Sequence, residues 1–196
     1  MTGDGLRERS KARRREAILR AAYELFAERG FEATTIADIA ERAEVSARTV
    51  TLYFPSKLDL ALARSAALAD RLGAALRDRR PGWVTVDALE HWVRNELADR
   101  GDLDNLSERM FDLDPQLRAA ANGRLAEVVQ EGARLLAAEQ GGSPDDFGPR
   151  MAAAAAAAVI SELFHRAETA DIDAAVAFLR AGLATLPSVS ASAGTV

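Results

Sequence analysis

Apolar residues recur at helical spacing along almost the whole chain, and this periodicity decides the fold class. In the first periodic segment they fall at positions i, i+4, i+7 and i+8, as on the buried face of a helix: Ile18, Ala22, Leu25 and Phe26. Alanine, the strongest helix former, supplies 42 of the 196 residues, whereas β-branched and aromatic residues are sparse. No stretch shows the alternation that predicts a strand. The sequence therefore predicts an all-α protein.

Capping residues, glycines and prolines divide this pattern into about nine helices. Gly30 ends the first helix, because glycine readily takes the left-handed conformation that follows a helix C-terminus. Thr34 or Thr35 can cap a short second helix, and Ser46 caps a third that runs to about Phe54. The remaining helices are expected at about 56–80, 85–100, 103–112, 115–140, 144–168 and 172–186. The segments 1–11 and 187–196 are expected to be disordered tails.

The charge of the chain is distributed unevenly. Its 25 basic and 30 acidic residues give a net charge of −5, which by itself argues against a nucleic-acid partner. Residues 1–57, however, hold 11 basic and 9 acidic groups, and residues 58–196 hold 14 and 21. The first 15 residues alone carry six basic and two acidic side chains. An N-terminal part that can approach phosphate is therefore followed by an acidic body that phosphate repels.

Composition excludes several classes of protein. The chain has no cysteine, which rules out a disulfide scaffold, a cysteine-ligated zinc site and a cysteine nucleophile. Its N-terminus lacks the apolar stretch of a secretory signal, and the Ala152–Ala158 run is too short and too weakly apolar to span a bilayer. We therefore expect a cytoplasmic protein without a membrane partner.

Residues 35–54 have the organisation of a helix-turn-helix motif, two helices of about eight residues joined by a tight turn. In such a motif the second helix fits the major groove of DNA, and the first helix braces it against the backbone. The candidate groove-facing residues are Ser46, Ala47, Arg48, Thr49, Thr51 and Leu52. Val50, Tyr53 and Phe54 include the residues that would anchor this helix on the core.

Residues 18–60 resemble the DNA-binding domain of the TetR family of transcriptional regulators. The match runs in one register through Ala22, Phe26, Gly30, Thr35, Ile36, Ile39, Ala40, Val45, Ser46, Thr49, Phe54, Ser56 and Lys57. The resemblance implies a three-helix DNA-binding domain over 12–72 and a larger helical domain over 83–186 that binds an effector and dimerises. It also implies the function, a sequence-specific repressor that a small molecule releases from its operator.

The resemblance assigns roles to residues of the motif, and physical chemistry is consistent with them. Phosphate contacts fall to Thr35, Tyr53 and Lys57. Arg48 would contact a base edge or a phosphate, since a bidentate arginine–guanine pair is the commonest specific contact. Thr49 and Thr51 would bond phosphate or pack on a thymine methyl group. The cluster Arg13–Arg15 would follow the DNA backbone or an adjacent minor groove.

Three positions depart from the family's usual pattern. Glu44 stands in the turn where the family usually has glycine, and it costs about 1 kcal/mol if the backbone keeps a positive φ. Arg48 stands where glycine is common, and Thr51 where an aromatic residue is common. The operator sequence therefore cannot be inferred from relatives.

The C-terminal part is expected to bind a second copy of the chain and an unknown small effector. The dimer interface is predicted on the last two long helices, at Ala155, Val159, Leu163, Val176, Leu179 and Leu183. The effector pocket is predicted to be lined by Trp83, Trp92, Met110, Phe111, Phe147, Phe164 and His165. A symmetric dimer presents two recognition helices, so the partner is expected to be a palindromic double-stranded DNA operator.

Two other classes of function fit parts of the sequence. A helical adaptor that has lost DNA binding would account for Glu44 and Thr51. A helical metal-dependent enzyme is suggested by the spacing of Glu162 and His165, but a di-metal site needs a second such pair, and the chain's other histidine, His91, has no glutamate three residues before it. Since sequence signatures of nucleotide-binding, metalloprotease and hydrolase sites are missing as well, we expect no catalytic residue, cofactor or metal.

Overall fold

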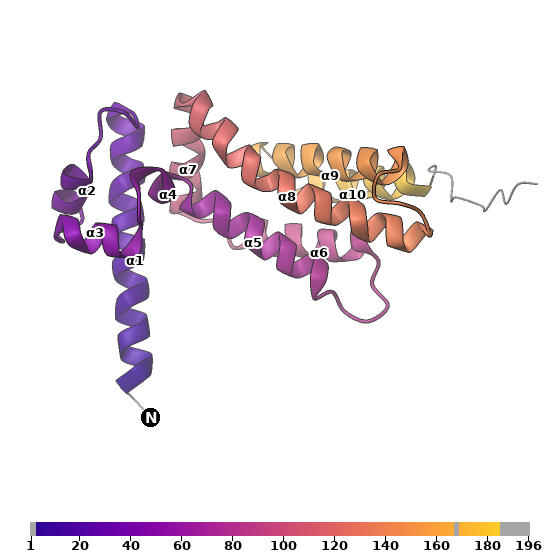
Figure 1. The fold of residues 1–196 in the computed structure, drawn as a ribbon, viewed down its shortest axis with the longest axis horizontal. Coiled ribbons are helices and arrows are strands. Elements are labelled where there is room, and N and C mark those ends of the chain that lie inside the picture. The colour runs from indigo at the N-terminus through magenta and orange to yellow at the C-terminus, as the bar shows by residue number, and fades with distance from the viewer. Residues whose placement is uncertain (1–2, 167–168, 185–196) are drawn as a thin grey trace, which may run out of the picture. The chain divides into compact units, whose positions relative to one another are not determined.

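The computed structural model describes residues 3–166 and 169–184, and every regular element in those two ranges is a helix (Figure 1). The helices are α1 (Gly3–Arg29), α2 (Ile36–Arg42), α3 (Ala47–Tyr53), α4 (Lys57–Ala61), α5 (Ala63–Arg77), α6 (Thr85–Ala98), α7 (Asp102–Leu113), α8 (Pro115–Gln140), α9 (Phe147–Arg166) and α10 (Thr169–Ala184). The predicted all-α class is confirmed. The tail expected at 187–196 lies outside the described residues.

The chain divides into two compact units. The N-terminal unit comprises Met1–Ala66 and Arg100–Ala121, and it holds α1 to α4 together with α7. Its core is built from fully buried side chains of all five helices: Ile18, Tyr23, Phe26, Ile39, Val50, Leu60 and Met110. Helix α1 runs through the middle of this core and packs against α2, α4 and α7.

The C-terminal unit comprises Ala67–Asp99 and Asn122–Val196. Its main core is formed by buried residues of α5, α6, α9 and α10: Leu72, Leu76, Ala88, Leu89, Trp92, Val93, Ile160, Leu163, Ile172 and Leu179. Helix α10 lies against both α6 and α9. Arg180 of α10 also forms ion pairs with two acidic residues of α6, at 2.7 Å from Asp87 and 3.0 Å from Glu90.

The first helix begins earlier than the sequence suggests. The segment 1–11 is expected to be disordered, yet α1 is helical from Gly3 onward. Residues 5–17 are all exposed, so the helix continues without support from the core. Its many arginines have high helix propensity, which explains why the N-terminal turns hold their form.

The single helix expected over 56–80 is two helices, separated at Leu62. The N–H of Arg64 donates to the hydroxyl oxygen of Tyr23 at 3.2 Å, rather than to the carbonyl four residues earlier. The Ser65 hydroxyl donates to the Leu62 carbonyl at 2.9 Å. These two bonds interrupt the regular series of backbone hydrogen bonds of the helix. Burial of the Tyr23 hydroxyl raises its pKa well above the ordinary value.

The packing units differ from the domain boundaries expected at 12–72 and 83–186. Residues 100–121 belong to the N-terminal unit, because the apolar face of α7 lies in the core around α1. Leu103, Met110 and Phe111 supply that face. Arg64 and Asp104 form an ion pair that joins α5 to α7 within the same unit.

Helix α9 contains an apolar stretch longer than the alanine run considered from the sequence. Phe147–Phe164 has a mean hydropathy of 1.2 over 18 residues, and 22% of these residues are buried. The buried ones include Ala152, Ala153 and Ile160, which pack in the C-terminal unit. One face of α9 therefore packs in that unit, while most of its apolar stretch is not buried.

Candidate nucleic-acid interface

Helix α2 is fixed at its start by a capping box. The Thr35 hydroxyl oxygen accepts the N–H of Asp38 at 3.2 Å, and the Asp38 carboxylate accepts the Thr35 N–H at 2.8 Å. The Thr35 hydroxyl also donates to that carboxylate at 2.6 Å, and these bonds, followed by the nearby Arg29, lower the pKa of Asp38. A phosphate at Thr35 would therefore meet a hydroxyl and an N–H that already bond Asp38, whose carboxylate is paired with Arg29.

The turn between α2 and α3 has a backbone conformation that is strained for any residue with a side chain. Glu44 has a φ of 53°, in the left-handed region. The turn is closed by the N–H of Val45, which donates to the Ala40 carbonyl at 2.9 Å. Glu44 therefore holds a positive φ of the kind that glycine readily adopts.

Helix α3 is anchored on one face and open on the other. Ser46 caps it, accepting the N–H of Thr49 at 3.0 Å. Val50 and Phe54 are buried in the core of the N-terminal unit. The outward face consists of Ala47, Arg48, Thr51 and Leu52, all exposed. Leu52 is 82% exposed, although a large apolar side chain is ordinarily buried at least in part.

The structure brings most of the predicted DNA-contacting residues together on α3. Ser46, Ala47, Arg48 and Thr51 are exposed, whereas Thr49 and Tyr53 are half-buried. The hydroxyls of Ser46 and Thr49 lie 2.8 Å apart, and the Thr51 hydroxyl donates to the Arg48 carbonyl at 3.1 Å. In the part of the chain that the structure describes, the Arg48 guanidinium is in no ion pair.

Lys57 is engaged inside its own unit. Its ammonium Nζ donates to the carbonyls of Phe31 and Thr34 at 2.8 and 3.0 Å, and to that of Glu32 at 3.4 Å. The same nitrogen lies 4.2 Å from the centre of the Phe31 ring. An ammonium has three donors, so a phosphate contact from Lys57 would require some of these bonds to break.

Other cations near the motif are neutralised by carboxylates of α1 and α2. Arg29 pairs with Asp38 at 2.6 Å, and Arg42 pairs with Glu28 at 3.1 Å and Glu24 at 3.4 Å. The hydrogen bond from Arg42 lowers the pKa of Glu28. These pairs fasten α2 to α1 and leave the outward face of α3 as the part of the motif that presents a free cation.

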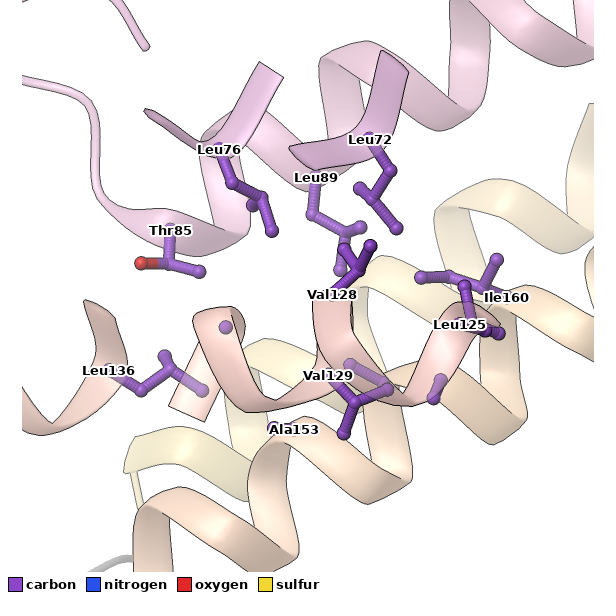
Figure 2. A pocket seen from close by; sticks show the side chains of 13 residues that line it. Leu72, Leu76, Thr85, Leu89, Leu125, Val128, Val129, Leu136, Ala153 and Ile160 are labelled. Carbon is purple, nitrogen blue, oxygen red and sulfur yellow. The ribbon is translucent and has the colours of Figure 1, made fainter. Parts of the chain in front are cut away.

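The C-terminal unit contains a small apolar cavity of about 40 Å³ (Figure 2). It is lined from α5, α6, α8 and α9 by Leu72, Leu76, Thr85, Leu89, Leu125, Val128, Val129, Gly132, Leu136, Ala153, Ala156, Ala157 and Ile160. Thr85 contributes the one hydroxyl in that set, and it donates to Glu139 at 2.7 Å. Arg79 lies 3.4 Å from the same carboxylate. The cavity wall is thus free of net charge.

The residues predicted to line an effector pocket do not form this cavity. Met110 and Phe111 lie in the core of the N-terminal unit. Trp92 and Phe164 pack against each other with ring centres 5.5 Å apart, and Trp83 contacts His91 edge-on at 5.2 Å. Phe147 is 78% exposed, and the side chain of His165 lies outside the described residues. The wall of the cavity is mainly aliphatic and contains no aromatic side chain, so a search for aromatic residues does not find it.

Four of the six residues predicted for the dimer interface lie in or against the core of the C-terminal unit. Leu163 and Leu179 are buried in the core of the C-terminal unit, and Val159 and Val176 pack against it half-buried. Ala155 is half-buried as well, and the side chain of Leu183 lies outside the described residues. The larger branched side chains mark the inward face of α9 and α10, because they fill the core of their own unit.

Residues 18–63 match the family model described as bacterial regulatory proteins, tetR family. Over 191 residues the chain is 36% identical to the HTH-type transcriptional regulator TcmR of Streptomyces glaucescens, covering 90% of this chain and 84% of that protein. It is 31% identical over 138 residues to the HTH-type transcriptional regulator RutR of Escherichia coli (strain K12), covering 68% of this chain and 65% of RutR.

Solved structures show the same fold. Salmonella enterica GusR superposes with a TM-score of 0.65 at 21% identity, over 87% of this chain and 95% of GusR. NalD, the secondary repressor of the MexAB-OprM multidrug efflux pump in Pseudomonas aeruginosa, superposes with a TM-score of 0.59 at 23% identity, over 89% of this chain and 97% of NalD. At these identities the likeness concerns the fold alone.

Proposed function

The chain belongs to the TetR family of bacterial regulatory proteins, and on that premise we propose that it is a dimeric cytoplasmic repressor, released from a palindromic operator by a small uncharged molecule. It is a DNA-binding transcriptional regulator, as its curated relatives are, and not an enzyme. The dimer, the operator symmetry, the effector and the cytoplasmic location are the proposed parts.

The observation that carries the proposal is the outward face of α3. Ala47, Arg48, Thr51 and Leu52 stand exposed on a helix whose opposite face is buried, so the helix can enter a major groove without losing its support. Arg48 supplies a cation for guanine or phosphate, and Leu52 supplies an apolar group for a thymine methyl. Lys57 stabilises the motif through its hydrogen bonds to the carbonyls of Phe31 and Thr34.

Selection of duplexes from a random DNA pool by the purified protein tests this function. A palindromic motif with two half-sites is expected, because two recognition helices of a symmetric dimer would read them. Arg48→Ala should weaken binding about 10- to 100-fold and relax the preference at one base pair in each half-site. Failure to enrich any sequence at moderate salt would refute the proposed function.

A second copy of the chain is the partner we propose for the outward faces of α9 and α10. Phe178 of α10 is 63% exposed and Met151 of α9 is exposed as well, beside alanines that allow helices to approach closely. Phe147 and Met151 also line an open groove of about 820 Å³ on α8 and α9. Exposed apolar surface of this kind is typical of an interface between subunits.

The apolar cavity is where we place the effector. Its wall carries no net charge, since the carboxylate of Glu139 is bonded to Thr85 and lies near Arg79. Burying a charged ligand there without a partner would be costly, so the effector is expected to be uncharged and largely apolar. Ligand pockets usually measure about 300 to 1,000 Å³, so the lining helices must separate to admit one.

Leu89→Trp, which fills the cavity, separates the effector's role from DNA binding. The variant is expected to bind the selected operator, yet to resist release by uncharged apolar compounds that release the wild-type protein. Arg48→Ala is the matched control with the opposite effect, since it should weaken binding to the operator and leave ligand binding intact. Release of the Leu89→Trp variant at wild-type ligand concentrations would place the effector elsewhere.

A further inference from the structure

The N-terminal half of α1 is a helix that stands free of the core. Residues 5–17 are exposed throughout, and at 1.5 Å per residue they span about 20 Å. In Figure 1 these turns of α1 continue past α2 and α3 toward the N-terminus. Residues 3–17, here called the basic arm, carry six basic and three acidic side chains.

The cations of the basic arm are aligned with the buried face of α1. Arg7, Lys11 and Arg14 stand at i, i+4 and i+7, one face of a helix. Ile18 and Leu25, at i+11 and i+18, continue the same face and are buried where α1 packs in the core of the N-terminal unit. The face of α1 that is buried in the core of the N-terminal unit therefore continues toward the N-terminus as a row of positive charge.

Arg15 connects this row to the recognition helix. Its guanidinium lies 5.0 Å from the centre of the Phe54 ring, and Phe54 is the C-cap of α3. Within the part of the chain that the structure describes, the cations of the row itself, Arg7, Lys11 and Arg14, take part in no ion pair. By contrast, Arg29 and Arg42 of the same unit are paired.

We propose that the basic arm binds the phosphate backbone of duplex DNA flanking each operator half-site, beyond the base pairs that α3 contacts. This rests on the proposed function. A helix of about 20 Å covers about six base pairs, enough for Arg7, Lys11 and Arg14 each to meet a phosphate. An anionic membrane fits the arm less well, because an interfacial helix needs an apolar face, and Leu6 is the one large apolar residue in the arm.

The test measures affinity for the selected operator as a function of salt. The triple variant Arg7→Ala, Lys11→Ala, Arg14→Ala should bind at least about tenfold more weakly. The slope of log K against log salt should become shallower by about 5, because the dimer loses three phosphate contacts in each subunit at about 0.9 per contact. Wild-type affinity should also fall when the duplex is trimmed to the half-sites, whereas the triple variant should be indifferent to trimming. The variant Arg7→Lys, Arg14→Lys keeps the charges and should keep the wild-type slope.

A matched control removes the same charge from elsewhere. Arg77→Ala, Arg109→Ala, Arg124→Ala replaces three exposed arginines outside the arm and should leave the slope unchanged. Circular dichroism checks that the arm stays helical, which alanine favours. If wild-type protein binds the operator and the arm variant retains its slope and flank dependence, the arm proposal is overturned and the proposed function stands. If wild-type protein binds no duplex, the proposed function itself fails, and the arm proposal with it.

Discussion

Glu44 holds a backbone conformation that side chains seldom adopt. Its φ is 53°. The residue lies in the turn of the helix-turn-helix motif, between Ala40, whose carbonyl accepts the N–H of Val45, and Ser46, which caps α3. A side chain in this region brings Cβ close to a carbonyl oxygen, at a cost of about 1 to 2 kcal/mol. Each flanking helix has its own N-cap, and buried side chains such as Ile39 and Val50 anchor both helices in the core, so the motif accommodates that cost.

We expect Glu44→Gly to raise the free energy of unfolding by up to about 1 kcal/mol, since relief of strain outweighs the added freedom of the unfolded chain. Glu44→Asn should be close to Gly, because asparagine tolerates left-handed backbone, and Glu44→Val should be less stable than wild type. Urea denaturation gives this order. A valine variant as stable as the glycine variant would show that the backbone at this position is not strained.

Lys57 stabilises the loop between α1 and α2 by satisfying three of its carbonyls. Lys57→Met keeps the aliphatic stem and removes the donors, so the free energy of unfolding should fall by about 1 to 3 kcal/mol. Lys11→Met, on the exposed arm, is the control and should leave stability unchanged. A Lys57→Met protein that keeps wild-type stability but loses operator affinity would instead assign Lys57 to phosphate.

At the scale of elements, the sequence predicts what nearby residues determine. The caps of α2 and α3 follow from a hydroxyl three residues before an N–H, and both form. The break between α4 and α5 depends on Tyr23, 41 residues from Arg64, and no local pattern reveals such a bond. The same limit applies to α7, whose apolar face could have packed in either unit.

The residues of the candidate site also divide into those that nearby sequence predicts and those that depend on tertiary packing. The outward residues of α3 were predictable, because helical spacing separates Arg48 and Thr51 from the buried Val50. The cavity was not, because it depends on how four helices pack around small side chains such as Gly132 and Ala153. Lys57 shows a third case, in which the residue type fits two roles and only tertiary contacts distinguish them.

Charged groups join α6 to α10. Arg180 bonds Asp87 and Glu90, Arg94 bonds Glu90, and Arg94 also pairs with Asp173. The hydrogen bond from Arg180 is the main reason why the pKa values of Asp87 and Glu90 lie below their ordinary values of 3.8 and 4.5. Because folding lowers these pKa values, the stability they contribute is present above the ordinary values and is lost as the pH falls through the lowered ones.

Arg180→Leu should therefore be less stable than wild type near neutral pH, and the difference should shrink as the pH falls from about 6 to about 3. Thermal denaturation across that range measures it. Arg134→Leu removes an ion pair with Glu131 three residues away on α8, and as an exposed local pair it should matter little at any pH. A difference for Arg180→Leu that stays constant with pH would exclude the carboxylates as its cause.

At the scale of the whole molecule, the outward apolar residues of α9 and α10 predict an assembly of two chains. Met151→Glu combined with Phe178→Glu should convert the dimer into a monomer, because a buried unpaired carboxylate opposes association. Sedimentation equilibrium measures the change, and operator affinity should fall with it. Leu113→Glu, at a residue 64% exposed on α7, is the matched control. A double variant that stays dimeric would move the interface elsewhere.

The inclusion of residues 100–121 in the N-terminal unit has a consequence for engineering DNA specificity. A chimera that transplants residues 1–66 into a relative would leave behind α7 and, with it, Met110 and Phe111 of the core around α1. The transplanted segment would then meet a foreign α7 and pack poorly against it. A working exchange must carry two stretches of sequence, or be restricted to the outward residues of α3.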